Sequence, residues 1–364
     1  MGHRSSTCQL ARVGKAGRSH HSSIVLRTKL AIRKAVEFLC LTVGDNGAWS
    51  DFPTNSSGVS TSWVTAHVLW NAGRVLPEGI ATRALRALIS EKQASGGWGF
   101  SASTPPDADS TAHALAAIVT TGGNVSMHED SAKFLLSHQK DDGGYATYLS
   151  KTQLARYRKR TSETDYTGWV QSHVCVTATV LEALTALGRT DGADVGRAVR
   201  FLRQRQSPCG FWTSYWWHSR YFATSHILSA LWKIDMEDCG SLVTSALRYI
   251  CNTQNPNGYW PDHAQTGAPC VLSTAWCVRG MGRIAKYFSA VKKGASWLLS
   301  MQCDDGSWLS APSLRIPPPH IRLPEHYGDW RVGRRGVGAI ANDERHIYTT
   351  AAVVAALYET VKEE

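Results

Sequence analysis

A short motif of glycine and an aromatic residue recurs six times along the chain and constrains its fold more than any other feature. Successive copies lie 47 to 49 residues apart, except for one interval of 67 residues. Self-similarity at a fixed period of this length is the signature of a repeat architecture, in which each repeat is one supersecondary unit. The aromatic members are Trp49, Trp98, Tyr145, Trp212, Trp260 and Trp308.

Each copy follows the end of an amphipathic segment, and a more apolar segment lies between consecutive copies. The stretch AVKKGASWLLSMQ at 290–302 has a helical pattern, and the glycine beyond it supplies a left-handed helix cap. In contrast, VTATVLEALTALG at 176–188 is apolar on nearly all sides, which indicates burial. The sequence therefore predicts six helix hairpins, with an inner ring of six helices wrapped by an outer ring of six.

The ends of the chain are complementary in this scheme. The first predicted helix, about 27–41, belongs to the outer ring, and the last, about 346–361, belongs to the inner ring. Pairing of the two closes the ring, so we expect an all-α, closed (α/α)6 barrel over residues 26–364. Excursions at about 146–171 and 309–345 interrupt the period, and such insertions tend to lie on one face and to serve binding.

The net charge of +10 is concentrated in part near the N-terminus. Residues 1–25 contain basic side chains and no acidic one, which predicts a basic, flexible tail. No apolar signal core and no run of 18 apolar residues is present, so we expect a cytoplasmic protein without a transmembrane segment. The basic residues follow no groove-reading motif, and we expect no nucleic-acid partner.

A glutamine stands four residues before the first motif glycine in four copies, at Gln139, Gln206, Gln254 and Gln302. These copies match the spacing QxxxGxW, with tyrosine as the aromatic residue in one. Because they contain these motifs, residues 27–364 resemble the squalene-hopene cyclase-like and prenyltransferase repeat superfamily. The resemblance implies the barrel fold, with the motifs bracing its outside.

Each predicted inner helix contains a Thr-Ala or Thr-Ser step. We align the six helices on this step and compare the residues that precede it, at the mouth of the inner ring. In the resembled family, the residue two positions before the threonine faces the cavity. At that position the chain has one carboxylate, Asp109, with Trp63, Cys175, Phe222, Leu272 and Tyr348 in the other repeats. Two residues earlier stand Asp107 in the second repeat and His173 in the third.

The stretch Asp107-Ala108-Asp109-Ser110-Thr111-Ala112 resembles the DxDD motif of class II terpene cyclases, whose middle aspartate protonates a terminal alkene or epoxide. The resemblance implies Asp109 as general acid and Asp107 as its partner. An apolar barrel and a second carboxylate both favour a neutral carboxylic acid. Asp is also a preferred helix N-cap, so a purely structural role is the alternative. Ser110 stands where the family has a third aspartate.

A carbocation requires a dry cavity with aromatic faces, which stabilise positive charge without offering a nucleophile. The predicted substrate-binding residues are Trp63, His173, Cys175, Trp216, Trp217, Phe222 and Tyr348. Basic residues of the two excursions are expected to hold an anionic head group, although a solvated loop is an equal alternative. They are Arg315, Arg322, Arg331, Arg334 and Arg335 in the second excursion, and Arg156, Arg158, Lys159 and Arg160 in the first.

The sequence thus predicts acid-initiated cyclisation of a linear isoprenoid or isoprenoid diphosphate. Two alternatives stay open: a zinc-dependent prenyltransferase-like barrel, and a non-catalytic toroid that binds an apolar ligand or a protein. Asp107, His173 and Cys175 have the residue types of zinc ligands, but the D-x-C pair of that family is absent. We expect no required cofactor, with Mg²⁺ relevant only to a diphosphate substrate. A lone barrel also leaves a homodimer possible.

Overall fold

The computed structural model describes residues 7–55, 57–158, 164–237, 239–261, 267–285 and 288–362, with side chains described from residue 24 onward. The six inner helices are α2 (Ser62–Ala72), α4 (Ala108–Thr120), α8 (Val174–Ala186), α10 (Arg220–Leu231), α12 (Val271–Ala285) and α14 (Ile347–Val361). The six outer helices are α1 (Thr7–Thr42), α3 (Glu78–Ser90), α5 (Glu129–Leu136), α9 (Ala193–Arg205), α11 (Cys239–Asn252) and α13 (Ser289–Ser300).

The two sets of helices differ in burial as their sequences predict. In α8, every residue from Cys175 to Thr185 is buried, whereas α3 buries only Ala84 and Leu88. A helix that is apolar on all sides can be stable only when neighbours surround it, and a helix with one apolar stripe needs a neighbour on one side. The helical, two-layered architecture is therefore confirmed.

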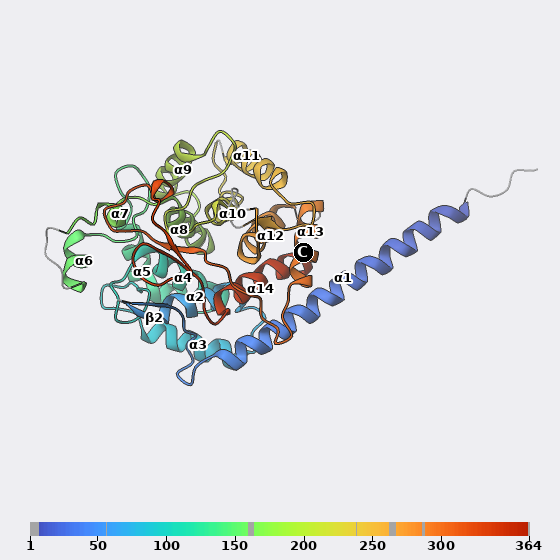
Figure 1. The fold of residues 1–364 in the computed structure, drawn as a ribbon, viewed down its shortest axis with the longest axis horizontal. Helices are drawn as coiled ribbons and strands as arrows, with labels where there is room; N and C mark the ends of the chain where they lie inside the picture. Colours follow the sequence, from blue (N-terminus) through green and yellow to red (C-terminus); the bar gives the residue numbers. More distant parts are fainter. Residues whose placement is uncertain are drawn as a thin grey trace, which may run out of the picture.

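The inner helices pack against one another in chain order, from α2 to α4, α8, α10, α12 and α14. Helix α14 also packs against α2, and α1 packs against both α13 and α14. The first and last repeats are therefore in contact, and the outer helices lie at the periphery of the molecule (Figure 1).

The recurring motif joins each outer helix to its neighbours, as the last copy illustrates. The indole of Trp308 donates to the Leu298 carbonyl of its own outer helix at 2.7 Å, and the Trp308 N–H donates to the Thr350 hydroxyl of α14 at 3.3 Å. The side-chain amide of Gln302 donates to the Ala31 carbonyl of α1 at 2.9 Å. Equivalent bonds from the backbone N–H of the aromatic residue reach Thr65, Thr111, Thr177, Thr224 and Thr274 in the other repeats.

Glycine is required in this motif for two reasons. Gly306 has a φ of 91°, which side chains other than glycine rarely adopt, and a Cβ there would lie 2.3 Å from the carbonyl oxygen of Lys34. The corresponding glycines Gly143, Gly210 and Gly258 approach the next outer helix equally closely. The motif thus sets the spacing of the outer helices.

The all-α prediction is wrong for the connections, which form three small sheets within the described part of the chain. An unsatisfied backbone group is costly when buried, and these irregular segments satisfy theirs by pairing. The strands are β1 (Asp51–Thr54) with β2 (Gly58–Ser60), β3 (Trp260–Pro261) with β4 (Pro269–Cys270), and the sheet β5-β7-β6 (Leu314–Ile316, Ala339–Ala341, Arg331–Val332). The last sheet and the short helix η2 (Pro324–His326) form the second excursion, while η1 (Val125–His128) precedes α5.

The two excursions meet at the N-terminal mouth of the inner ring. The first forms α6 (Lys151–Tyr157) and α7 (Thr167–Val170), and its residues Lys159 and Arg160 lie outside the described part of the chain. From the first excursion, the Gly168 N–H donates to the Pro319 carbonyl at 2.8 Å and the Trp169 indole donates to the Pro317 carbonyl at 3.0 Å.

Helix α1 begins at Thr7, within the segment for which the sequence predicts a tail, and its N-terminal part extends away from the other helices (Figure 1). Residues 1–6 lie outside the description, and the boundary at residue 26 stays a prediction. Among the described residues, no helix combines the length and apolar character needed to cross a bilayer.

Candidate active site

The first turn of α4 separates the roles of the two predicted carboxylates. Asp107 is the N-cap: its Oδ1 accepts from the Ser110 N–H and its Oδ2 from the Ser110 hydroxyl, both at 2.8 Å. Asp109 lies one half-turn later and does not cap the helix. The alternative that Asp109 is only a helix cap is therefore wrong, because Asp107 occupies that position.

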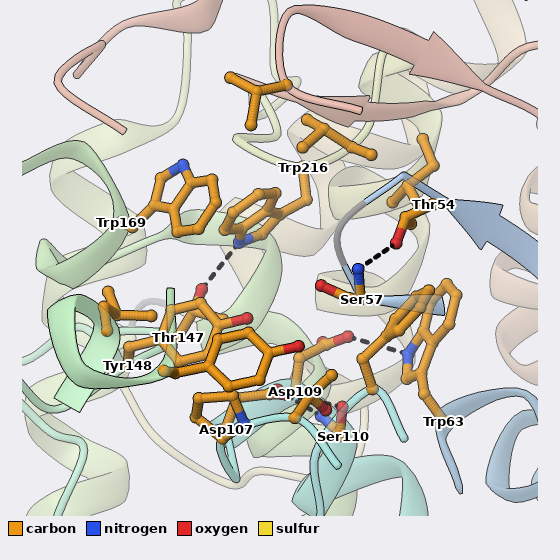
Figure 2. Close-up of a pocket in the computed structure, with 18 of the residues that line it drawn as sticks. Thr54, Ser57, Trp63, Asp107, Asp109, Ser110, Thr147, Tyr148, Trp169 and Trp216 are labelled. Atoms are coloured by element: carbon orange, nitrogen blue, oxygen red, sulfur yellow. Dashed lines mark hydrogen bonds between the residues drawn. The ribbon is translucent and has the colours of Figure 1, made fainter. Parts of the chain in front are cut away.

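The carboxyl group of Asp109 is held by two donors from neighbouring inner helices. Its Oδ1 accepts from the Thr179 hydroxyl of α8 at 2.7 Å, and its Oδ2 accepts from the indole of Trp63 in α2 at 3.1 Å. The side chain is 18% exposed and lies at the wall of a cavity (Figure 2). Donors of this kind fix the orientation of the group and stabilise its ionised form.

Asp107 is more deeply buried than Asp109 and titrates differently from a solvated carboxyl. Burial, together with the nearby Asp109, raises the pKa of Asp107 to about 7 against the opposite effect of the bonds from Ser110. Near neutral pH, both protonation states of Asp107 are therefore populated, and it lines the same cavity as Asp109.

The cavity has largely aromatic walls. Figure 2 shows Trp169 and Trp216 facing Asp107 and Asp109 from the opposite side, with Trp63 at one flank. Trp216 is oriented by its indole, which donates to the Thr147 hydroxyl at 2.7 Å. Trp63, Trp216 and Trp217 thus line the cavity together with both carboxylates.

Four other predicted binding residues form a layer behind this wall. Phe222 and Tyr348 pack on Trp217, with ring centroids 4.5 and 5.4 Å away. Cys175 is also buried, and burial raises the pKa of its thiol to about 11. His173 is buried with its Nδ1 2.7 Å from the Thr147 hydroxyl and its Nε2 2.8 Å from the Gly168 carbonyl, and burial lowers its pKa to about 3.

The side chains considered as zinc ligands are not assembled into a metal site. Within the described residues, no group of three or more His, Cys, Asp or Glu side chains is close enough to hold a metal ion. Both ring nitrogens of His173 are engaged with Thr147 and Gly168, and Asp107 is engaged with Ser110.

Of the predicted head-group arginines, Arg158 and Arg315 line the cavity, whereas Arg334 and Arg335 lie at its edge. Arg334 and Arg335 are exposed, and Arg335 donates to Glu344 at 2.7 Å. The next two residues, Gly336 and Val337, do line the cavity.

The cations that line the cavity are Arg158 of the first excursion and Arg315 of the second. Arg158 lies over the ring of Trp169, 5.4 Å from its centroid. Arg315 is buried and donates to the Ser214 carbonyl, while its Nε has no partner among the described residues.

Thr179 was not predicted from the sequence, although a signal for it exists. His67, His113 and His226 each stand two residues after the aligned threonine of their repeat, and Thr179 stands at the same position in the third repeat. Residues at this position contact the preceding repeat around the ring. His67 stacks on Tyr348 at 3.4 Å, and Thr179 bonds to Asp109.

Comparisons with known proteins agree with this geometry. The family model described as the squalene-hopene cyclase C-terminal domain matches residues 89–312. The chain is 26% identical over 314 residues to a squalene–hopene cyclase of Bradyrhizobium diazoefficiens, covering 76% of this chain and 47% of that protein. It is 23% identical over 278 residues to a drimenyl diphosphate synthase of Streptomyces showdoensis, covering 74% of this chain and 46% of that protein. The chain thus spans about half the length of these relatives.

Among solved structures, similarity extends over nearly whole chains. The apo type II terpene cyclase MstE from Scytonema is 26% identical, with a TM-score of 0.82 over 91% of this chain and 97% of the other. A variant of MstE in complex with its substrate, geranylgeranyl dihydroxybenzoate, gives a TM-score of 0.84 at 26% identity, over 93% of this chain and 99% of the other. Another variant contains the product merosterolic acid A, with 27% identity, a TM-score of 0.84 and coverage of 93% and 99%.

Proposed function

Since the chain belongs to the squalene-hopene cyclase C-terminal domain family, we propose that it is a class II terpene cyclase-like enzyme. Its reaction is the acid-initiated cyclisation of a linear isoprenoid or isoprenoid diphosphate. The similarity to MstE, which binds a geranylgeranyl compound as substrate, supports the isoprenoid class. A prenyltransferase-like or purely binding function is not favoured by these relatives.

One observation carries the proposal: Asp109 lies at an aromatic cavity, free of the capping role, between two hydrogen-bond donors. In its neutral form this group transfers its proton to the terminal carbon of an alkene, and the alkene π electrons form the new C–H bond. The carboxylate left behind is the form that Thr179 and Trp63 stabilise.

The cation formed at the neighbouring carbon is then attacked by the next double bond of the chain, which closes a ring and moves the charge along. The faces of Trp169, Trp216 and Trp217 stabilise this moving charge without reacting with it. Loss of a proton from the last cation ends the sequence, so that the product is an isomer of the substrate. Asp107, whose pKa lies near 7, is placed to exchange protons within the same cavity.

The head group of the substrate is expected at the side of the cavity formed by the excursions. Arg158 and Arg315 line this side, and guanidinium groups suit carboxylate and phosphate oxygens. Arg334 and Arg335 are retained as rim residues that meet the head group as it enters. The role of Mg²⁺ with a diphosphate substrate stays a prediction.

We also infer that the ring of repeats is a closed (α/α)6 barrel. The packing of α14 on α2, together with the bond from Gln302 to the Ala31 carbonyl, supports closure between the last and first repeats. The domain limits, the cytoplasmic location and the homodimer stay predictions.

The decisive experiment compares wild type with Asp109→Asn on a panel of linear isoprenoids and their diphosphates, in deuterated water. Wild type should place one solvent deuteron at the former alkene terminus. Asp109→Asn should give no product at an almost unchanged melting temperature, because the helix cap is Asp107. A product without solvent deuterium, or an active Asp109→Asn variant, would show that Asp109 is not the acid.

A further inference from the structure

A second cavity lies at the end of the inner ring opposite to the candidate active site. Its volume is about 180 Å³, and residues at or just beyond the C-terminal halves of all six inner helices line it. They include Trp70 of α2, Val119 of α4, Glu182 of α8, Arg279 of α12 and Glu359 of α14, with Lys233 just after α10. The catalytic proposal makes no use of this cavity.

Positive side chains outnumber negative ones in its wall. The cations are Arg74, Lys233, Arg279 and Arg283, whereas the carboxylates are Glu182 and Glu359. The wall therefore carries two more positive than negative side-chain charges.

Both carboxylates are already engaged by arginines, of which Arg279 is buried and Arg283 is partly buried. Arg279 and Arg283 donate to Glu182 at 3.2 and 2.9 Å, and Arg283 also donates to Glu359 at 3.1 Å. Glu182 further contacts His226, and Glu359 pairs with Lys362. These acids have little capacity left for the remaining cations.

Among the described residues, three donor groups of this cavity have no protein partner, and two of them belong to the solvent-exposed side chains of Arg74 and Lys233. Within the described residues, neither Arg74 nor Lys233 forms an ion pair, and the Nε of Arg279 has no hydrogen-bond partner although that side chain is only 4% exposed. Burial lowers the pKa of Lys233, and Arg283, Arg279 and Arg74 lower it further against the opposite effect of Glu182. The cations thus act on one another across the cavity.

The C-terminal ends of helices carry partial negative charge, which offsets some of this excess. That effect falls off within the last turn, and capping bonds reduce it here. The Gly73 N–H donates to Leu69 at the end of α2, and the Leu187 N–H donates to Ala183 at the end of α8. Neutralisation of helix ends is nevertheless the competing explanation for the cations, and the experiment below separates the two.

We propose that this cavity binds a small multivalent oxyanion of the phosphate or diphosphate class. The guanidinium of Arg74 can match two oxygens of such a group, the unpartnered Nε of Arg279 can donate to another, and Lys233 supplies a point charge at the rim. Because the unpartnered Nε of Arg279 belongs to a buried side chain, the ligand must enter fully, so we assign the site to a free anion rather than to the head group of a membrane lipid. The proposal does not depend on the cyclisation reaction.

The test is calorimetric titration of the full chain with inorganic pyrophosphate and with phosphate, at constant ionic strength set by chloride. Saturable binding is expected, with a matching rise in melting temperature because the ligand binds only the folded chain. Arg74→Gln with Lys233→Gln should weaken binding at least tenfold. The charge-matched control Lys29→Gln with Arg86→Gln, on exposed positions of α1 and α3, should bind as wild type does.

The active-site cavity also holds cations, so Arg158→Gln is included to separate the two sites. Retained pyrophosphate affinity in Arg158→Gln, together with lost affinity in the Arg74 and Lys233 variant, supports the proposal. Absence of saturable binding to wild type, or equal affinity in wild type and the Arg74 and Lys233 variant, would overturn it and leave the cations as neutralisers of helix ends. Circular dichroism of each variant confirms that it is folded.

Discussion

Replacing Thr179 with valine tests whether the hydroxyl that bonds to Asp109 assists proton transfer. Valine retains the branched shape of threonine, so packing around α8 should change little. The hydroxyl also lies 3.0 Å from the Val176 carbonyl of its own helix, an oxygen that keeps its place in the helix without it. The substitution therefore removes one hydrogen bond to Asp109 and leaves no buried carbonyl without a hydrogen-bond partner.

The expected loss follows from the charge that Asp109 acquires during the reaction. The Thr179 bond of 2.7 Å is made to a group that becomes an anion as the proton leaves. A hydrogen bond to a charged group contributes about 1.5 to 3 kcal/mol. If this whole contribution is gained only in the transition state, its loss in Thr179→Val should lower kcat by about ten- to a hundredfold, since each 1.36 kcal/mol corresponds to a factor of ten.

The assay is single-turnover cyclisation with product analysis, alongside a melting curve for each variant. KM should stay near its wild-type value, because Thr179 is not among the residues lining the cavity. Thr179→Ser keeps the hydroxyl and should recover most of the rate. A Thr179→Val enzyme with wild-type kcat would refute the reasoning, as would a Thr179→Ser enzyme that is no faster than Thr179→Val.

Three further predictions address the partner acid, the repeat motif and the head group. Asp107→Asn should slow turnover less than Asp109→Asn. The fold raises the pKa of Asp107 to about 7. The stabilising contribution of this carboxyl is therefore present below pH 4 and lost as the pH rises through 7. As a result, the melting temperature of Asp107→Asn relative to wild type should increase between pH 5 and 8. Gly306→Ala should cost about 1 to 3 kcal/mol of stability through strain and overpacking, measured by urea unfolding, whereas Gly79→Ala, which meets no atom within 4 Å, should be neutral or stabilising. Arg158→Gln should raise KM about tenfold for a substrate with an anionic head group, from loss of a charge-assisted bond, while the exposed neighbour Arg156→Gln should not; equal KM values would exclude Arg158 from the head-group site.

The pattern of the chain alone was sufficient to predict the two layers of helices. The bonds that define a repeat are local or join adjacent repeats, as in the contact of the Trp308 indole with a carbonyl ten residues earlier. A glycine at a positive φ and a helix that is apolar on all sides are each compatible with few structures. Their recurrence in the sequence therefore predicts the repeat fold. The DxD stretch could be recognised from the sequence because Asp107 and Asp109 belong to one helix turn.

The different roles of the two aspartates were determined only by the tertiary structure. Both residues are aspartates and can cap a helix, and their offset of half a turn determines that Asp107 bonds to Ser110 while Asp109 bonds to Thr179. Thr179 reaches Asp109 from another helix, 70 residues away along the chain. The second excursion places Arg315 rather than Arg335 in the wall, because its strands follow hydrogen-bond pairing that no repeat period encodes.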